Sequence, residues 1–237
     1  MNYYLAGYYL LKTKPIDYGE DIFNIAYTAS SCINNGVLDN WSYSWRSDND
    51  NEIDAIKALF KIDNESIASI REWVDNAFNN ELIGWQNIFR DLATLKEYIT
   101  FFPNKESFIV LSLYFSEINA DELIQEFSPK SSQNGRIGME LFLSEKRIEQ
   151  ELDEEKDIGF DLIGIEISSD FHSFYCHNVT SELLSKFHFL HINKYGLFNK
   201  LDQQQIKIVE EYANMDNTGF EPVSWFMVKT KLVDISK

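Results

Sequence analysis

The chain has 237 residues, of which 44% are hydrophobic and 15% are aromatic, and this composition is typical of a folded globular protein rather than a disordered one. Thirty-eight acidic residues against 21 basic ones give a formal net charge of −17. A negative field of this size repels nucleic-acid phosphates and anionic lipids, so we expect neither nucleic-acid nor membrane binding and favour a basic protein partner. The same charge also suits a protein that is simply kept soluble.

Three features of the sequence favour a cytoplasmic location. The first residues show no basic segment ahead of an apolar run and no cleavage site of small residues, so we do not expect a signal peptide. No apolar run approaches the roughly 18 residues of a membrane span. The two cysteines, Cys32 and Cys176, are too few for a disulfide framework, which fits a reducing compartment.

The N-terminal part begins with a predicted strand. Residues 3–12 are rich in Tyr and Leu at both alternating positions, which predicts a strand buried on both faces and a candidate for the centre of a sheet. Residues 21–33 fit either a helix or a strand, and we predict a helix. The Asn-Asn-Gly sequence at 34–36 predicts a turn.

An aromatic segment follows. Trp41, Tyr43 and Trp45 alternate along the chain, so an extended backbone would place the three rings on one face. Two interpretations stay open for this segment. It is either a strand that seals the core or an exposed set of aromatic anchors for a partner.

Hydrophobic periodicity predicts most of the remaining elements. We expect helices at residues 52–60, 66–78, 85–101, 179–187, a short one capped by Asn119, and a last one that Asp202 opens in a capping box with Gln205. We expect strands at residues 106–115, 139–143 and 223–233, and a long bent strand or hairpin over 158–178 that turns at 168–170. A further turn is expected at 195–196.

The most acidic stretch is residues 149–157, which hold six acids and one lysine. Such runs usually form a solvated loop or helix end, and the alternative is a docking surface for a basic partner. Together with the polar loop at 129–138, this stretch is the best candidate for a boundary. Neither side has a self-sufficient pattern, so we expect residues 1–237 to form a single domain, with a subdivision near 129–157 as the alternative.

The histidines and cysteines suggest two kinds of chemistry. On a strand, His172 and Cys176 share a face and His177 points to the other, so His172, Cys176 and one later histidine (His188 or His191) are a conceivable zinc site. Cys176 with a histidine base is a conceivable nucleophile. Neither matches a standard spacing, and no phosphate-binding loop, dinucleotide fingerprint, nucleophile elbow or zinc-protease helix occurs. We therefore predict no catalytic residue, no metal and no cofactor.

The C-terminal third resembles a known class of proteins. Its sequence contains DLIGIEISSDFHSFYCHN at 161–178, NKYGLF at 193–198 and FEPVSWF at 220–226. This succession is similar to bacterial immunity proteins of polymorphic toxin systems, in which a glycine-interrupted strand enters a loop with serine or cysteine and a Trp follows a Glu-Pro pair. The resemblance covers residues 160–226. It implies a cytoplasmic inhibitor that blocks the active site of a cognate toxin.

We therefore expect an α+β fold with a mixed or antiparallel sheet flanked by helices, and an acidic binding protein that is not an enzyme. The alternatives are a small hydrolase or metal-dependent enzyme centred on His172 and Cys176, and an adaptor protein with another partner. Charge complementarity speeds association with a basic toxin and aromatic anchors hold the complex. The predicted binding residues are Glu151, Asp153, Glu154, Glu155, Asp157, Trp41, Tyr43 and Trp45.

Overall fold

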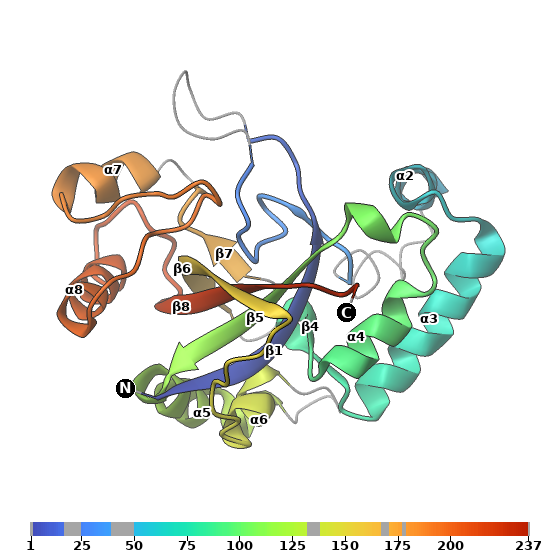
Figure 1. The fold of residues 1–237 in the computed structure, drawn as a ribbon, viewed down its shortest axis with the longest axis horizontal. Coiled ribbons are helices and arrows are strands. Elements are labelled where there is room, and N and C mark those ends of the chain that lie inside the picture. Colours follow the sequence, from blue (N-terminus) through green and yellow to red (C-terminus); the bar gives the residue numbers. More distant parts are fainter. Residues whose placement is uncertain are drawn as a thin grey trace.

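The centre of the molecule is an antiparallel eight-stranded sheet in the order β3-β4-β1-β5-β8-β6-β7, with β2 paired to β1 (Figure 1). The structure is a computed structural model that describes residues 2–16, 25–38, 50–131, 138–166, 171–176 and 179–236. The strands are β1 (Tyr3–Lys12), β2 (Asn35–Gly36), β3 (Ile83–Gly84), β4 (Ile88–Phe89), β5 (Ile109–Ser116), β6 (Glu155–Ile165), β7 (Phe171–Ser173) and β8 (Ser224–Val233).

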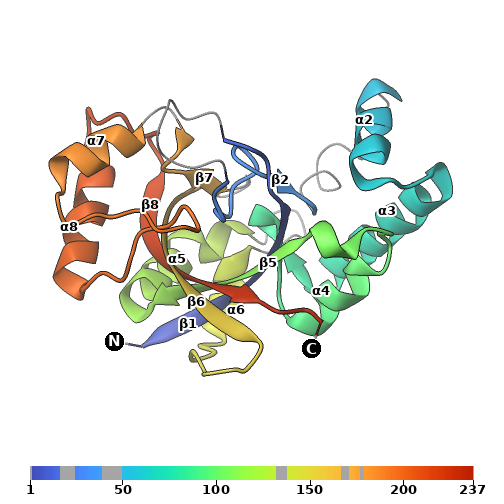
Figure 2. The same ribbon diagram turned by 45° about the horizontal axis from the view of Figure 1, so that its top comes forward.

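Helices flank this sheet in three groups. The α-helices are α2 (Asp50–Phe60), α3 (Asn64–Asn79), α4 (Leu92–Ile99), α5 (Glu117–Ser131), α6 (Met139–Ser144), α7 (Val179–Lys186) and α8 (Gln203–Ala213). Helices α2–α4 lie at one end of the sheet, α7 and α8 lie at the opposite end, and α5 and α6 cover the face between them (Figures 1 and 2). The expected α+β class is confirmed, and all strand pairs in the described residues are antiparallel.

Side chains of the long strands alternate between separate cores. In β1, Leu5, Tyr8 and Leu10 pack with helices α2–α4, whereas Tyr4, Ala6, Tyr9 and Leu11 pack with α5 and α6. In β6 and β8, alternate residues enter the α5–α6 core or a third core formed with α7 and α8. Because both faces of β1 are covered, its Tyr- and Leu-rich sequence forms a central strand, as predicted.

Glycines mark the two places where the ladder is irregular. The register of β1 shifts between Leu5 and Gly7, and that of β6 shifts between Asp157 and Gly159. Gly7 has φ +144 and Gly159 has φ +131, which side chains rarely tolerate. A Cβ at Gly159 would lie 2.4 Å from the carbonyl oxygen of Phe198, so close approach of the chain also requires glycine there.

Several predicted elements are confirmed. Helix α3 contains the stripe predicted for 66–78, with Asp63 as its N-cap. The helices predicted at 52–60 and 179–187 and the strand at 106–115 match α2, α7 and β5 within a few residues. Asp202 and Gln205 form the predicted capping box, β6 and β7 form the predicted hairpin, and β8 is the predicted closing strand. Strands on both sides of residues 129–157 belong to the one sheet.

Four predictions were wrong in their type or their bounds. Residues 139–143 form helix α6 and not a strand. Within the predicted helix 85–101 only α4 is an α-helix, because Gln86 and Asn87 have positive φ in the turn between β3 and β4 and Asp91 caps the helix anew. The part of 21–33 that is described, from residue 25, contains no helix. Helix α5 begins at Glu117, and Asn119 does not cap it.

Candidate functional site

The acidic segment, residues 149–157, is held at the edge of β1. The amide of Leu5 donates to the carbonyl of Arg147 and the amide of Glu149 donates to the carbonyl of Tyr3, both at 2.8 Å. The chain then turns and enters β6 at Glu155, which pairs with Val233 of β8. This segment is therefore part loop and part strand, and its position is fixed by backbone bonds at both ends.

The structure separates the five predicted binding acids into two groups. Glu151 and Asp153 are exposed and Glu154 is half-buried. In contrast, only 1% of the Glu155 side chain is exposed, and its Oε2 accepts a hydrogen bond of 2.8 Å from the Tyr114 hydroxyl. Asp157 is exposed, but it lies 3.2 Å from the Nζ of Lys229. The expectation of a surface acid was wrong for Glu155, because strand pairing directs its side chain inward.

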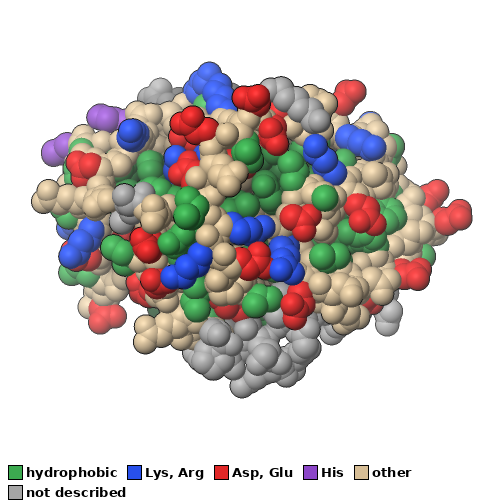
Figure 3. Space-filling view, turned by 60° about the horizontal axis from the view of Figure 1, so that its bottom comes forward, with side chains coloured by type: hydrophobic (Ala, Val, Ile, Leu, Met, Phe, Trp, Pro, Cys, Tyr) green, Lys and Arg blue, Asp and Glu red, His purple; other side chains and the backbone are tan. Residues whose placement is uncertain are grey.

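Two lysines of β8 neutralise the inner part of this segment. Lys229 and Lys231 are two residues apart, so they share one face of the strand. Their Nζ atoms lie 2.5 Å and 2.8 Å from Oε1 of Glu149, and Lys231 is also 3.5 Å from Oε2 of Glu155. Burial would raise the pKa of Glu149, but hydrogen bonds from both lysines outweigh it and lower that pKa. On the face of the molecule in Figure 3, Lys and Arg side chains lie among Asp and Glu side chains.

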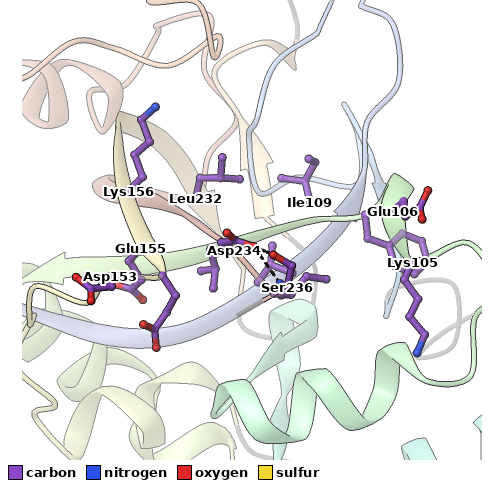
Figure 4. Close-up of a pocket in the computed structure, with 14 residues that line it drawn as sticks. Lys105, Glu106, Ile109, Asp153, Glu155, Lys156, Leu232, Asp234 and Ser236 are labelled. Atoms are coloured by element: carbon purple, nitrogen blue, oxygen red, sulfur yellow. Dashed lines mark hydrogen bonds between the residues drawn. The ribbon is translucent and has the colours of Figure 1, made fainter.

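Beside the acidic segment lies a groove of about 710 Å³. Its apolar lining comes from the start of β5 and the end of β8: Phe108, Ile109, Val110, Leu232, Val233 and Ile235. Its charged lining is mainly acidic: Glu106, Asp153, Glu154, Glu155 and Asp234, with Lys105 and Lys156. Figure 4 shows Asp153 and Glu155 at one end, Lys105 and Glu106 at the other, and Asp234 between them. We call this the acidic groove.

The acidic groove combines features of a protein-binding site. Its apolar floor offers area that a partner can bury, and its acidic rim favours a cationic side chain over an anionic one. The predicted aromatic anchors Trp41, Tyr43 and Trp45 lie outside the described residues. The groove itself was not predicted, because residues near 106, 154 and 234 meet only through the pairing of β5, β6 and β8.

A second group of polar side chains, with a carboxylate and two thiols, lies near His172 on β7. Its Nδ1 lies 2.5 Å from Oε2 of Glu221. Cys176, in the turn after β7, shares a thiol–thiol hydrogen bond with Cys32. His188 and His191 are both exposed, and His177 lies outside the described residues. In the described part of the chain, no three His, Cys, Asp or Glu side chains are arranged to hold a metal ion.

The two thiols differ in acidity. The hydrogen bond from Cys176, a bond with Ser30 and the proximity of His172 lower the pKa of Cys32 to about 6. The bond with Cys32 and burial raise the pKa of Cys176. The surroundings therefore favour ionisation of Cys32 over that of Cys176, which the sequence had offered as a conceivable nucleophile. Only long-range structure distinguishes them, because neither has a telling neighbour in the sequence.

A buried carboxylate, also missed from the sequence, holds this cluster together. Asp161 of β6 is fully buried, and its Oδ2 accepts hydrogen bonds from the Thr28 hydroxyl at 2.7 Å and the Ala29 amide at 3.1 Å. The Thr28 hydroxyl also lies 3.1 Å from the Ser173 hydroxyl of β7. Burial raises the pKa of Asp161 to about 7. These bonds fix residues 25–34 in an irregular conformation and explain why no helix forms there.

Comparisons with known proteins add no identity. No protein-family model matches the chain, and neither the curated proteins nor the solved structures include a significant match. Among the described residues, no helix combines the length and the apolar character that crossing a membrane requires.

Proposed function

We propose that this protein is an acidic, immunity-type binding protein that neutralises a basic toxin by occluding its active site. The observation that carries the proposal is the acidic groove of about 710 Å³, which combines an apolar floor with carboxylates on its rim. The net charge of −17 supports rapid encounter with a basic partner. A cytoplasmic location fits the two free thiols.

The acids that a partner would contact at this end of the groove are Asp153 and Glu154, which line it, and the exposed Glu151 two residues before Asp153; we call these three the rim acids. Glu151 and Asp153 are exposed and Glu154 is half-buried, so their charges face solvent. Glu155 and Asp157 instead hold Lys231 and Lys229, and replacing them would disturb the sheet as well as the surface. If the toxin is a nuclease, its cleft is positive, and the rim acids would take the places of phosphates.

The test is a pair of charge-reversal variants. The rim variant is Glu151→Lys, Asp153→Lys and Glu154→Lys. The control variant is Glu72→Lys, Asp75→Lys and Glu81→Lys, which changes net charge equally at exposed positions of and after α3. The wild-type protein, the rim variant and the control variant serve as baits for lysate of the source organism, and mass spectrometry identifies retained proteins.

We expect one basic protein to bind the wild type and the control variant. Its retention by the rim variant should fall at least about tenfold, because each close charge pair lost from an interface weakens binding by about 1 kcal/mol or more. The retained protein should lose its enzymatic activity on addition of the wild type. Equal retention by both variants would show that binding depends on net charge or on another surface.

A further inference from the structure

Both cysteines of the chain lie in one place, although they are far apart in the sequence. Cys32 lies in the turn at residues 31–33, within the loop at 25–34 that Asp161 fixes. The side-chain amide of Asn34 closes this loop by donating to the carbonyls of Ala26 and Thr28 at 2.9 Å and 3.0 Å. Cys176 lies three residues after Ser173. The hydrogen bonds through Asp161 and Thr28 therefore hold the segments that carry the two thiols side by side.

The surroundings of the two thiols differ in a way that assigns a role to each. Cys32 is exposed and Cys176 is half-buried, so an oxidant in solution reaches Cys32 first. The groups that face Cys32 are Cys176, Ser30, His172 and Glu221, and only Glu221 opposes its ionisation among these four. A thiolate at the surface with a second thiol in hydrogen-bond contact is the arrangement of redox-sensitive cysteine pairs.

We propose that Cys32 and Cys176 form a peroxide-reactive thiol pair, in which Cys32 is the attacking thiolate and Cys176 the resolving thiol. The Cys32 thiolate attacks one oxygen of hydrogen peroxide, the O–O bond breaks, and the departing hydroxide takes a proton to become water. Cys176 then attacks the sulfenic acid of Cys32, its proton leaves with the hydroxide as a second water, and an S–S bond forms. Two thiols are oxidised, and one hydrogen peroxide is reduced to two waters.

A neutral oxidant fits this site better than an anionic one. The protein has a net charge of −17, and the carboxylate of Glu221 lies close to His172 beside the thiols. Glutathione disulfide carries several carboxylates and is repelled by this field, whereas hydrogen peroxide is uncharged. The oxidised pair would join the loop at residues 25–34 covalently to the turn after β7.

The expected rate advantage is modest. Near pH 7 a thiol with a pKa of about 6 is thiolate roughly thirty times more often than an unperturbed one, and its lower basicity reduces its nucleophilicity roughly tenfold. The folded protein should therefore react about threefold faster than the unfolded chain. The more specific signature is the pH profile, in which the reaction of Cys32 should reach half its maximal rate near pH 6.

The test treats the full-length protein with hydrogen peroxide and follows each cysteine by mass spectrometry. We expect a peptide that joins Cys32 to Cys176. Cys176→Ser should stop at a sulfenic acid on Cys32 that dimedone traps, and Cys32→Ser should give no dimedone adduct. Circular dichroism before oxidation checks that both variants are folded, and the protein in denaturing urea serves as the rate reference.

Three results would overturn the proposal. One is that Cys176 is modified before Cys32 in the folded wild type. The second is that excess peroxide gives only over-oxidised or intermolecular products, and the third is that folding gives no rate advantage and no midpoint near pH 6. Glutathione disulfide is tested in parallel at equal concentration. A faster reaction with it than with hydrogen peroxide would replace the peroxide by an anionic disulfide as the oxidant and refute this assignment.

Discussion

Asp161 of β6 and the acids of the loop before this strand differ in burial and in role, although they are close in sequence. Asp161 is fully buried and binds the loop at residues 25–34 through Thr28 and Ala29. Glu151 and Asp153 are exposed to solvent beside the acidic groove. A run of acids is therefore not one functional unit. Acids that are buried against partners inside the protein determine the fold, and acids that are exposed at the surface are accessible to a second molecule.

The largest effect that would sharpen this comparison is expected at Asp161. Asp161→Ala leaves the Thr28 hydroxyl and the Ala29 amide without their acceptor in a buried site, so we expect the free energy of unfolding to fall by about 3 kcal/mol. Asp161→Asn keeps an acceptor oxygen and should lose about 1 kcal/mol. Glu151→Ala, at an exposed position, should change it by less than about 0.5 kcal/mol.

Urea denaturation followed by circular dichroism measures all three variants. An Asp161→Ala variant as stable as Glu151→Ala would contradict the distinction between the two groups of acids, since it would mean that the buried carboxylate holds nothing essential.

A second prediction concerns the boundary between the two groups, at Lys231. Its side chain is 6% exposed and faces Glu149 and the buried Glu155. Lys231→Met leaves Glu155 without its cation, whereas Glu149 keeps its pair with Lys229. We therefore expect the free energy of unfolding to fall by about 2 kcal/mol. Lys207→Met removes a lysine whose side chain is 75% exposed and which pairs with Glu211, and it should cost less than about 0.5 kcal/mol.

Thermal and urea unfolding of both lysine variants test this boundary. Equal losses would show that the carboxylate of Glu155, which lines the acidic groove, is solvated in solution and accessible to a partner.

The sequence predicted those parts of the structure that depend on local patterns. The strand Tyr3–Lys12 is buried on both faces, and the Asp202–Gln205 capping box marks its helix, because both signals lie within a few neighbouring residues. The strand predicted at residues 139–143 was wrong, because a five-residue apolar segment fits a helix as well as a strand. The roles of Asp161 and Cys32 could not be predicted, since each depends on partners more than a hundred residues away.

The candidate site shows the same limit. The acidic segment was recognised from its composition, but composition does not say which acids turn inward. Both Glu154 and Glu155 border the groove, but Glu155 turns its carboxylate to Tyr114 and Lys231 because β6 begins there and pairs with β8. A register decided by distant strands thus selects the acids that are left for binding.

The last prediction uses pH to distinguish buried from solvated acids. Burial raises the pKa of Asp161 and of Glu210 to about 7, and Oε1 of Glu210 accepts hydrogen bonds from the Met227 amide and the side chain of Asn119. The folded protein therefore holds these protons more tightly than the unfolded chain. Their contribution to stability is complete below the unfolded pKa near 4 and is lost as pH rises to about 7.

We expect the free energy of unfolding to fall by about 2 kcal/mol per pH unit between about pH 5 and about pH 7, since each of the two carboxylates contributes about 1 kcal/mol per pH unit. This trend is opposite to the usual behaviour of carboxylates. Asp161→Asn and Glu210→Gln should each flatten this slope. Glu149→Gln is the matched control: lysines lower the pKa of Glu149, so its contribution is lost only at more acidic pH and the slope should persist. A wild-type free energy of unfolding that is constant or rises across this pH range would mean that water reaches both buried carboxylates. Asp161 and Glu210 would then be solvated as the rim acids are, only to a smaller extent.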